Sequence, residues 1–490
     1  MNLVEALRAG AAAGGWLDRP AYEVDGTLLT HAAVYDGAAR VAGGLIEAGV
    51  RPGDRVALVL DDGTDFVLSF LGAAHAGAVA VPVNPRLHPD ELRQVVGSAR
   101  PALVVCRSED VPRLTGFRTT GFADLAGARP VPVVPRALDD EVYATFTSGT
   151  TGVPRMCPHL HGDPPIGFRS FGSAGLGLGP GDVVHSVSKL YFSFGLGNSL
   201  LYPLTAGCRV VLNPDPPLVD DVLAIVDKYH VTALFAVPTF YARLIAHPGG
   251  ERLAGLRIAS TGGEVLSTSL EERLMGVLGD RLLNNIGATE VGQAFAANTP
   301  TARRVGTVGR ALPPCEVRVV DERGDPVEPD VVGRLQVRGP TVTLGTGDDG
   351  APVRTRDWYA TGDLASLDAD GFLRVTGRLD DIENVGGIKV HPLEVEHLLV
   401  GHPLVREAAV CAVADRDGAT RLRAYVVRAD LARADGPADD ALAEELIASV
   451  RRDLTAYKVP REVVFVPALP RTGSGKLRRH VVREWRAEIG

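Results

Sequence analysis

The sequence contains few cysteines, and no two of them lie close together. None forms a CxxC pair, and their number is odd: Cys106, Cys157, Cys208, Cys315 and Cys411. Disulfide frameworks and zinc knuckles need paired or closely spaced cysteines. The spacing therefore argues against both.

The sequence also lacks an excess of positive charge. Lys and Arg total 51 against 60 Asp and Glu, which gives a formal net charge of −9. Proteins that bind nucleic acids or anionic membranes generally present a basic face. Neither kind of partner is predicted.

Long hydrophobic runs are absent as well. The first residues, MNLVEALRAGAAAGGW, include Glu5 and no long apolar core, which does not fit a signal peptide. The segment 66–83 is apolar except for Ser69 and His75, but it is rich in Gly and Ala and ends in the strand-like VAVPV. We expect a buried helix followed by a strand there, no membrane span, and a cytoplasmic protein.

What is present is typical of a large globular protein. The 490 residues are 45% hydrophobic and 23% charged, enough for two to four domains with their own cores. In the first two thirds, β-rich runs alternate with amphipathic stretches, which predicts an α/β architecture. The expected strands are 55–60, 102–106, 208–212 and 233–237, with helices such as 89–99 and 219–230 between them.

The pattern of predicted secondary structure changes from about residue 318 onwards. Short strands are predicted at 316–320, 333–338 and 371–375, with turn pairs such as Asp370-Gly371 between them, which favours hairpins or a small β-barrel. After 377–381 a βαββ-like pattern begins, with helices at 392–400 and 441–454 and strands at 408–413 and 423–427. The expected domains are therefore 1–379, with stacked αβ subdomains and a small barrel, and 380–490, a small α+β domain.

The most informative segment is 145–155, TFTSGTTGVPR. Glycines allow backbone N–H groups to converge on one anion, hydroxyls can donate to phosphate oxygens, and an arginine can neutralise charge. The spacing differs from the GxxxxGK[ST] loop. Taken alone, the segment also fits a surface turn, and both interpretations stay open. The candidate phosphate-binding residues are Thr147, Ser148, Gly149, Thr150, Thr151, Gly152 and Arg155.

Four further segments follow in order along the chain: 285–290 (NIGATE), 358–363 (WYATGD), 377–381 (GRLDD) and 470–476 (PRTGSGK). With the loop, they resemble the signature motifs of the adenylate-forming superfamily, which includes acyl- and aryl-CoA synthetases, adenylation domains and luciferases. The resemblance spans most of the chain. It implies that ATP and a carboxylate give an acyl adenylate and pyrophosphate, followed by transfer to a thiol.

The resemblance also implies roles for individual residues. Glu290 would bind Mg²⁺, a cation that prefers oxygen ligands, and Thr289 would contact the α-phosphate. Asp363 would accept hydrogen bonds from the ribose hydroxyls, beside Arg378. Adenine would lie against two segments: Gly262, Gly263 and Glu264, and Asn285 and Ile286.

The C-terminal domain would act as a mobile lid. Lys476 would bridge the substrate carboxylate and the α-phosphate in the transition state. Asp380 would be the hinge for a second orientation, in which Gly386 and Gly387 leave room for a pantetheine arm.

The segment 189–198, KLYFSFGLGN, resembles the aryl branch, typified by benzoate- and hydroxybenzoate-CoA ligases. Gln293 and Ala294 stand where benzoate enzymes tend to have His and a larger aliphatic residue. We therefore expect a substituted or bicyclic aryl acid, hydroxylated or aminated. The implied pocket residues are Tyr191, Ser193, Phe194, Gly195, Gly287, Ala288, Gln293 and Ala294.

Several questions stay open at this level. Arg155 and Asn384 replace lysines that are frequent in the superfamily. The acceptor thiol could belong to CoA or to the phosphopantetheine of an acyl carrier protein, for which Arg451-Arg452 or Arg478-Arg479 could form a basic patch. An enzyme that stops at the adenylate or uses it for amide or oxidative chemistry, and a nucleotide-binding protein without catalysis, are the alternatives. Relatives are commonly homodimers.

Overall fold

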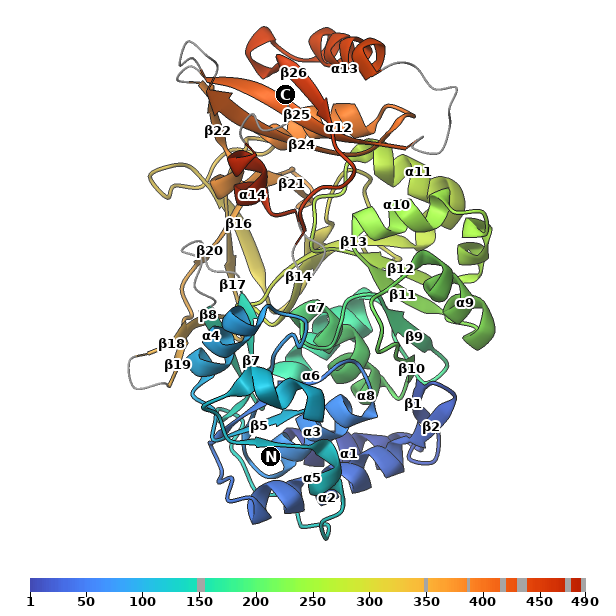
Figure 1. Ribbon diagram of the computed structural model, residues 1–490, viewed down its shortest axis with the longest axis vertical. Coiled ribbons are helices and arrows are strands. Elements are labelled where there is room, and N and C mark those ends of the chain that lie inside the picture. Colours follow the sequence, from blue (N-terminus) through green and yellow to red (C-terminus); the bar gives the residue numbers. More distant parts are fainter. Residues whose placement is uncertain are drawn as a thin grey trace.

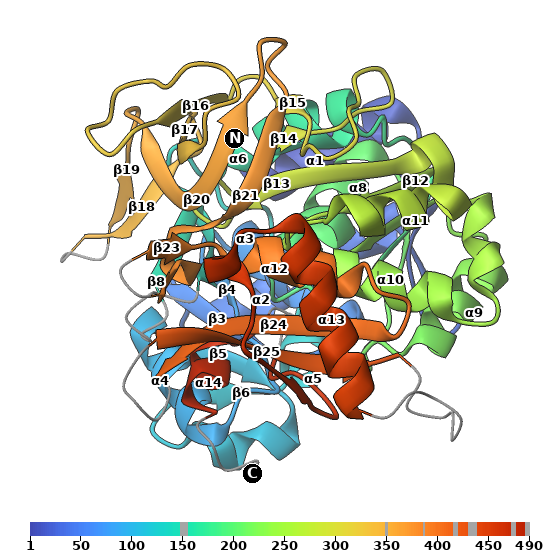
Figure 2. The same cartoon turned by 90° about the horizontal axis from the view of Figure 1, so that it is seen from above.

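The computed structural model describes residues 1–147, 155–347, 351–385, 388–414, 420–429, 439–471 and 477–485 (Figure 1). Two large sheets occupy the N-terminal two thirds, and a smaller antiparallel sheet follows them. The C-terminal residues form a separate layer at one end of the long axis (Figures 1 and 2). The expected mixed α/β fold with a large N-terminal and a small C-terminal part is confirmed.

The first large sheet has six strands in the order β6-β5-β3-β4-β7-β8. Its strands are parallel except for β8, which returns antiparallel to β7. The bounds are β3 Arg55–Val59, β4 Val79–Pro82, β5 Leu103–Cys106, β6 Thr119–Thr120, β7 Glu141–Thr147 and β8 Arg155–Leu160.

The second large sheet has nine strands in the order β15-β14-β13-β12-β11-β9-β10-β1-β2. Its central strands are parallel, and β2, β14 and β15 pair antiparallel at the two ends. The bounds are β1 Pro20–Val24, β2 Thr27–Thr30, β9 Val183–Ser186, β10 Arg209–Val211, β11 Ala233–Ala236, β12 Ile258–Thr261, β13 Leu282–Ala288, β14 Gln293–Ala297 and β15 Arg310–Ala311.

Helices cover both sheets, and the largest core cluster lies where α1, α2 and α3 meet them. Helix α4 has Pro89 in its first turn, followed by Asp90 and Glu91, whose charges favour a helix N-terminus. The bounds are α1 Leu3–Gly14, α2 His31–Glu47, α3 Thr64–His75, α4 Pro89–Ala99, α5 Phe122–Ala126, α6 Asp163–Gly167, α7 Ser193–Leu196, α8 Tyr202–Ala206, α9 Val219–Tyr229, α10 Pro238–Ala246 and α11 Thr268–Leu278.

The expected small barrel takes the form of an antiparallel sheet, ordered β16-β17-β20-β21, and a separate hairpin, β18-β19. Its bounds are β16 Glu316–Val320, β17 Gly333–Arg338, β18 Thr343–Thr346, β19 Pro352–Arg354, β20 Tyr359–Leu367 and β21 Leu373–Arg378. The one-turn helix η6 (Leu379–Asp381) leads from this sheet into the C-terminal layer.

The C-terminal layer is built on the sheet β24-β25-β26 and the hairpin β22-β23. One apolar cluster packs this sheet against α12 and α13, and a second packs it against α14. The bounds are β22 Glu383–Val385, β23 Ile388–Val390, α12 Pro392–Val400, β24 Val405–Ala414, β25 Thr420–Arg428, α13 Asp439–Asp453, β26 Glu462–Phe465 and α14 Arg479–Glu484.

The apolar segment 66–83 folds as predicted, with the buried helix α3 leading into the buried strand β4. No helix in the described part of the chain combines the length and the apolar character that crossing a bilayer demands.

Candidate active site

The predicted phosphate-binding segment connects β7 to β8. Thr147 ends β7 and stands opposite Arg155, which begins β8. Gly345 of β18 has a φ of +101°, and a Cβ at this position would lie 2.8 Å from Nε of Arg155. This glycine therefore leaves space for the arginine side chain. The remaining predicted residues lie outside the described residues: Ser148, Gly149, Thr150, Thr151 and Gly152.

Thr289 and Glu290 lie in the tight connection between β13 and β14. The N–H groups of Val291 and Gly292 both donate to the carbonyl oxygen of Ala288, each at 3.0 Å. The hydroxyl of Tyr359, on β20, is in hydrogen-bonding contact with Glu290, and burial and this carboxylate raise the pKa of Tyr359. The connection therefore brings Glu290 next to the sheet that carries Asp363.

A chain of hydroxyl groups links this connection to the other strands. Ser193 Oγ lies 3.1 Å from Thr145 Oγ1 and donates to Thr289 Oγ1 at 3.3 Å. Thr145 belongs to β7, two residues before Thr147. Three segments far apart in sequence thus meet at one point: the predicted phosphate-binding hairpin, the predicted aryl segment and the Thr289 connection.

The two predicted adenine-binding segments are neighbours. Asn285 donates from Nδ2 to the carbonyl oxygen of Thr261 at 2.7 Å, and it is buried. A Cβ on Gly262 would stand 2.6 Å from Asn285 Oδ1 and 3.0 Å from its carbonyl oxygen, so a larger residue here would require Asn285 to move. Gly263 follows with a φ of +86°, and Ile286 follows Asn285 on β13.

The two predicted ribose-binding residues also face one another. Asp363 on β20 stands opposite Arg378, the last residue of β21, and Arg378 Nη1 donates to Asp363 Oδ1 at 3.2 Å. Gly362, with a φ of +80°, makes room for the guanidinium group. The arrangement places the Asp363 carboxylate beside the guanidinium group of Arg378.

The C-terminal layer reaches the adenine segment through Arg471. Its Nη1 lies 3.4 Å from Glu264 Oε1, and its Nη2 lies 2.6 Å from Glu407 Oε2 on β24. Arg471 also pairs through its backbone with Leu477. Lys476 lies outside the described residues, but the two residues that flank 472–476 therefore meet next to Glu264.

The predicted hinge lies in η6. Asp380 accepts a hydrogen bond at its carbonyl oxygen from Arg483 Nη2 at 3.1 Å. Arg479, also on α14, is largely buried and makes two 2.7 Å hydrogen bonds to Glu396. The prediction that Arg479 could belong to an exposed basic patch is therefore wrong. Gly386 and Gly387 lie outside the described residues.

The predicted aryl-pocket residues of β13 and β14 pair directly. Gly287 stands opposite Ala294, and Ala288 opposite Gln293. Gln293 is 7% exposed, and its Nε2 donates to Cys315 Sγ at 3.6 Å, while Oε1 has no hydrogen-bond partner among the described residues. A buried acceptor without a partner carries a desolvation cost.

The remaining predicted pocket residues lie on or before α7. Phe194 contacts Phe235 edge-on, with ring centroids 6.2 Å apart, and Tyr191 contacts Phe192 in the same manner. A Cβ on Gly195 would lie 2.0 Å from the carbonyl oxygen of Lys189, so glycine permits the tight turn into α7.

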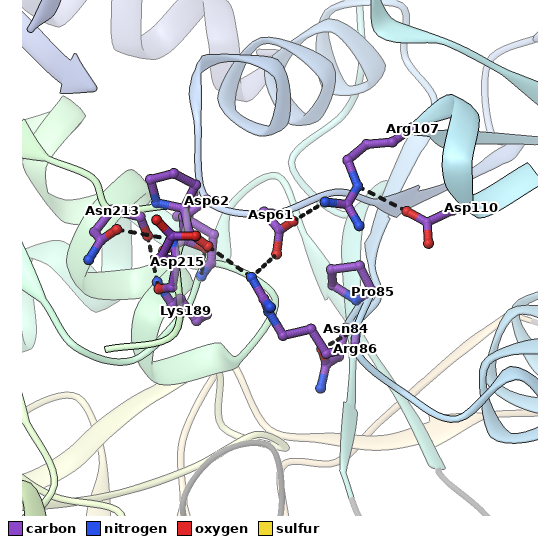
Figure 3. Close-up of polar contacts among 12 residues, drawn as sticks. Asp61, Asp62, Asn84, Pro85, Arg86, Arg107, Asp110, Lys189, Asn213 and Asp215 are labelled. Carbon is purple, nitrogen blue, oxygen red and sulfur yellow. Dashed lines mark hydrogen bonds and ion pairs between the residues drawn. The ribbon is translucent and has the colours of Figure 1, made fainter. Parts of the chain in front are cut away.

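Charged residues at the carboxyl ends of strands from both large sheets support this segment (Figure 3). Asp62, which follows β3, accepts the N–H of Leu190 at 2.8 Å, and Lys189 donates to the carbonyl oxygen of Asp215 at 2.6 Å. Figure 3 shows Asp61 between Arg86 and Arg107, at 3.0 and 2.7 Å.

Sequence reasoning missed several residues around this site. They include Thr145, Cys315, Tyr202 and Gly167. Gly167 lies close to the pocket residues, because a Cβ on it would stand 2.7 Å from Gln293 Oε1 and 3.2 Å from the Tyr202 hydroxyl. The alternation of hydroxyls in 145–151 could have included Thr145. Nothing in the sequence indicates that Cys315 lies beside Gln293.

Comparison with known proteins agrees with this geometry. Residues 10–345 match the AMP-binding enzyme family, and residues 394–476 match the AMP-binding enzyme C-terminal domain. The chain therefore belongs to the AMP-binding enzyme family, and the predicted resemblance to adenylate-forming enzymes is confirmed.

Individual relatives and solved structures show which members of the family the chain is similar to. The chain is 37% identical to p-hydroxybenzoic acid–AMP ligase FadD22 of Mycobacterium tuberculosis, over 99% of this chain and 69% of the relative. It is 35% identical to the 4-hydroxybenzoate–CoA/benzoate–CoA ligase of Rhodopseudomonas palustris, over 93% of this chain and 89% of the relative. The solved anthranilate CoA ligase AuaEII, in complex with anthranoyl-AMP, superposes with a TM-score of 0.90 at 28% identity, covering 99% of this chain and 97% of that chain.

Proposed function

We propose that this protein is an acid–thiol ligase that uses ATP to convert an aromatic carboxylic acid into an aryl adenylate, and then transfers the aryl group to CoA with release of AMP. The contact between Ser193 and Thr289 carries the proposal, because it joins the predicted aryl segment to the predicted phosphate-binding residues. A carboxylate beside Ser193 would meet the α-phosphate beside Thr289, and such positioning supplies much of the rate of phosphoryl-type transfer.

The nucleotide would lie along the surface formed by the segments that meet here. The ribose hydroxyls would bond to Asp363, and adenine would lie against 262–264 and 285–286. Lys476 would enter from the C-terminal side, because the flanking Arg471 contacts Glu264. The same proposal sets the domain boundary between residues 379 and 380, with Asp380 as the hinge of the lid.

Magnesium fits this arrangement as an ATP-bound ion. Among the described residues, no cluster of three or more His, Cys, Asp or Glu side chains could hold a metal ion by itself. Mg²⁺ at nucleotide sites usually takes one or two carboxylates, with the remaining ligands from phosphates and water. Glu290, partly exposed, would supply the carboxylate, and the ion would neutralise phosphate charge.

The proposed substrate carries a hydrogen-bond donor on its ring. Gln293 supports this choice, because its Oε1 is buried and lacks a partner among the described residues. A hydroxyl or amino group would satisfy it, whereas unsubstituted benzoate would not. The names of the relatives, which include hydroxybenzoate and anthranilate ligases, agree with such a substituent.

CoA is the proposed acceptor, and a holo acyl carrier protein is the alternative. Arg451 and Arg452 are exposed on α13 and could form a basic patch for an acidic carrier. A homodimer and a cytoplasmic location stay predictions from the sequence.

The test has two stages. ATP–pyrophosphate exchange with a panel of acids should be fastest with a hydroxy- or aminobenzoate, and thioester formation should then be measured with CoA and with a holo carrier protein. Fastest exchange with a linear fatty acid would contradict the aryl assignment. Exchange without any thioester product would favour an enzyme that stops at the adenylate. ATP binding without exchange for any acid would favour a nucleotide-binding protein.

A further inference from the structure

The carbonyl groups of Thr289 and Glu290 are both held by hydrogen bonds from other elements. Nε2 of His159 lies 2.8 Å from the carbonyl oxygen of Thr289. The backbone N–H of Thr343 donates to the carbonyl oxygen of Glu290 at 2.8 Å. Since a carbonyl oxygen only accepts, His159 must carry its proton on Nε2 in this contact. The backbone of this pair is therefore fixed at two consecutive peptide groups.

The residues that hold these carbonyls are themselves connected. Thr343 pairs across β18-β19 with Arg354, whose guanidinium group grips both oxygens of Asp163, at 2.7 and 3.0 Å. Asp163 Oδ2 accepts the backbone N–H of Leu160, the residue after His159, at 3.0 Å. The same oxygen lies 3.4 Å from Nδ1 of His159, which has no hydrogen-bond partner among the described residues. The contacts thus run from His159 through Thr289-Glu290 and back to the backbone next to His159, at Leu160, and we call this set of residues the carbonyl clamp. Its other members are Thr343, Arg354 and Asp163.

The carbonyl clamp is buried and tightly packed. His159 is fully buried and Asp163 is 7% exposed. His159 stands opposite Tyr143 on β7, with ring centroids 5.0 Å apart. A Cβ on Gly292, which has a φ of +73°, would stand 2.6 Å from Cε1 of the imidazole, so only glycine fits beside it. Hydrogen bonds in such surroundings are strong and allow little displacement.

His159 also lies on the strand that begins with Arg155 and returns from the phosphate-binding segment. It therefore ties the hairpin that would hold the β- and γ-phosphates to the pair that would contact the α-phosphate and Mg²⁺. We infer that His159, oriented by Asp163 and Arg354, is a positioning residue for adenylation, which sets the distance between these two parts of the nucleotide site. The inference rests on the proposed function of Thr289 and Glu290.

The first experiment compares ring and amide replacements of His159. His159→Phe keeps the ring but loses the donor, and we expect kcat for ATP–pyrophosphate exchange to fall by about 10- to 100-fold, as for displacements near 1 Å. The KM for the aryl acid should change less than about 3-fold. His159→Gln, which can place an N–H near the position of Nε2, should restore kcat to within about 5-fold of the unmodified protein.

His161 provides the matched control. It is also buried, two positions along, but its Nδ1 accepts the backbone N–H of Leu3 at 3.0 Å. His161→Phe should lower the melting temperature and leave kcat within about 2-fold. Equal losses of kcat in the two Phe variants, or an unchanged kcat in His159→Phe, would overturn the inference. If His159→Phe does not fold, Asp163→Asn serves in its place, with an expected 3- to 10-fold loss of kcat, and an unchanged kcat would again overturn it.

A structural measurement that does not depend on catalysis tests this inference separately from the proposed function. In a crystal structure of His159→Phe, or of Asp163→Asn if the first does not fold, the connection 289–292 should move by about 1 Å relative to β12 and β20. An unmoved connection would overturn the clamp even in a fully active protein. If the unmodified protein shows no ATP–pyrophosphate exchange, the proposed function is refuted. The carbonyl clamp would then be tested by the crystal structures alone.

Discussion

The proposed aryl segment, 189–198, and the proposed lid, the C-terminal domain, are attached to the rest of the molecule in different ways. The aryl segment is held by buried groups: Asp62 is 3% exposed and Lys189 is 6% exposed, and both bond to backbone groups (Figure 3). The contact between the lid and the adenine segment uses Arg471 and Glu264, whose side chains are 27% and 14% exposed and 3.4 Å apart.

This difference matches what each region would have to do. Buried hydrogen bonds in a low-dielectric environment fix one geometry, which suits a pocket that selects a ring. Ion pairs nearer the solvent contribute little free energy and weaken with salt, which suits a domain that must detach and turn. The aryl segment would thus form a fixed wall of the substrate pocket, and the C-terminal domain a lid that can detach.

The first prediction concerns Asp62 and the aryl segment that it supports. Asp62→Ala leaves the buried N–H of Leu190 without an acceptor, so below pH ~7, where Asp62 is protonated in the folded state, the free energy of unfolding should fall by about 2 kcal/mol. The KM for the aryl acid should rise while the KM for ATP stays constant. The control is Asp61→Ala, since Asp61 pairs with half-exposed arginines, and its loss should stay near ~1 kcal/mol. Equal losses in the two variants would contradict the fixed wall.

The pH dependence of stability tests the same carboxyl. Burial raises the pKa of Asp62 from 3.8 to about 7, although Lys189 and the Leu190 N–H oppose the shift. The folded state therefore favours the protonated form, and this stabilisation is present below pH ~4 and is lost as pH rises through ~7. Relative to Asp62→Asn, the unfolding free energy of the unmodified protein should fall by up to ~4 kcal/mol across this range. The unfolding free energies are measured by chemical denaturation. If the difference between the two proteins does not change with pH, the burial of the Asp62 carboxyl is contradicted.

On the lid, Lys476→Ala should have the largest effect. Under the proposed role of Lys476, the variant loses a cation that stabilises charge only in the transition state, so the exchange kcat should fall by about 10²- to 10³-fold. The Kd for ATP, measured by calorimetry, should stay within about 3-fold. Arg478→Ala removes an exposed cation two residues away and should leave kcat within about 3-fold. An undiminished rate in Lys476→Ala would refute the assigned role.

Gln293→Leu should alter substrate choice with little change in stability. The kcat/KM for a hydroxy- or aminobenzoate should fall by about 10- to 100-fold, because the ring donor loses its acceptor. Benzoate should change less than about 3-fold. A parallel decrease for both substrates would show that Gln293 does not contact the ring substituent.

The smallest effect is expected for Arg471. Arg471→Ala removes a partly exposed ion pair and should lower kcat by only about 2- to 5-fold. The salt dependence of the rate should weaken in the variant, because the screened contact is gone. Arg338→Ala, which breaks a comparable exposed pair with Glu316 at 2.7 Å, is the control and should change neither quantity.

Much of the fold could be predicted because local signals agree with the tertiary structure. Helix α4 begins at Pro89 and ends at Ala99 as expected, and the strand 316–320 matches β16. The separate pairing of β1 with β10 and the π-helical segments Phe168–Gly175 and Gly197–Leu201 were not predicted. These features depend on packing between distant segments, which periodicity does not encode.

The candidate site, like the fold, could be predicted from the sequence only in part. The resemblance to adenylate-forming enzymes predicted that Asp363 and Arg378 would lie side by side, and they form a contact because β20 and β21 are adjacent strands. Arg479 looked like a surface cation, but Glu396, 83 positions away, neutralises it. His159 gave no signal, since a lone histidine on a strand cannot reveal that Thr289 lies 2.8 Å away.

The most direct test of the account is a crystal structure with a non-hydrolysable hydroxybenzoyl-adenylate analogue. We predict that its ribose hydroxyls bond to Asp363, that its acyl linkage lies between Ser193 and Thr289, and that its ring hydroxyl bonds to Oε1 of Gln293. An analogue bound elsewhere, or with its ring away from Ser193 and Gln293, would contradict the assignment.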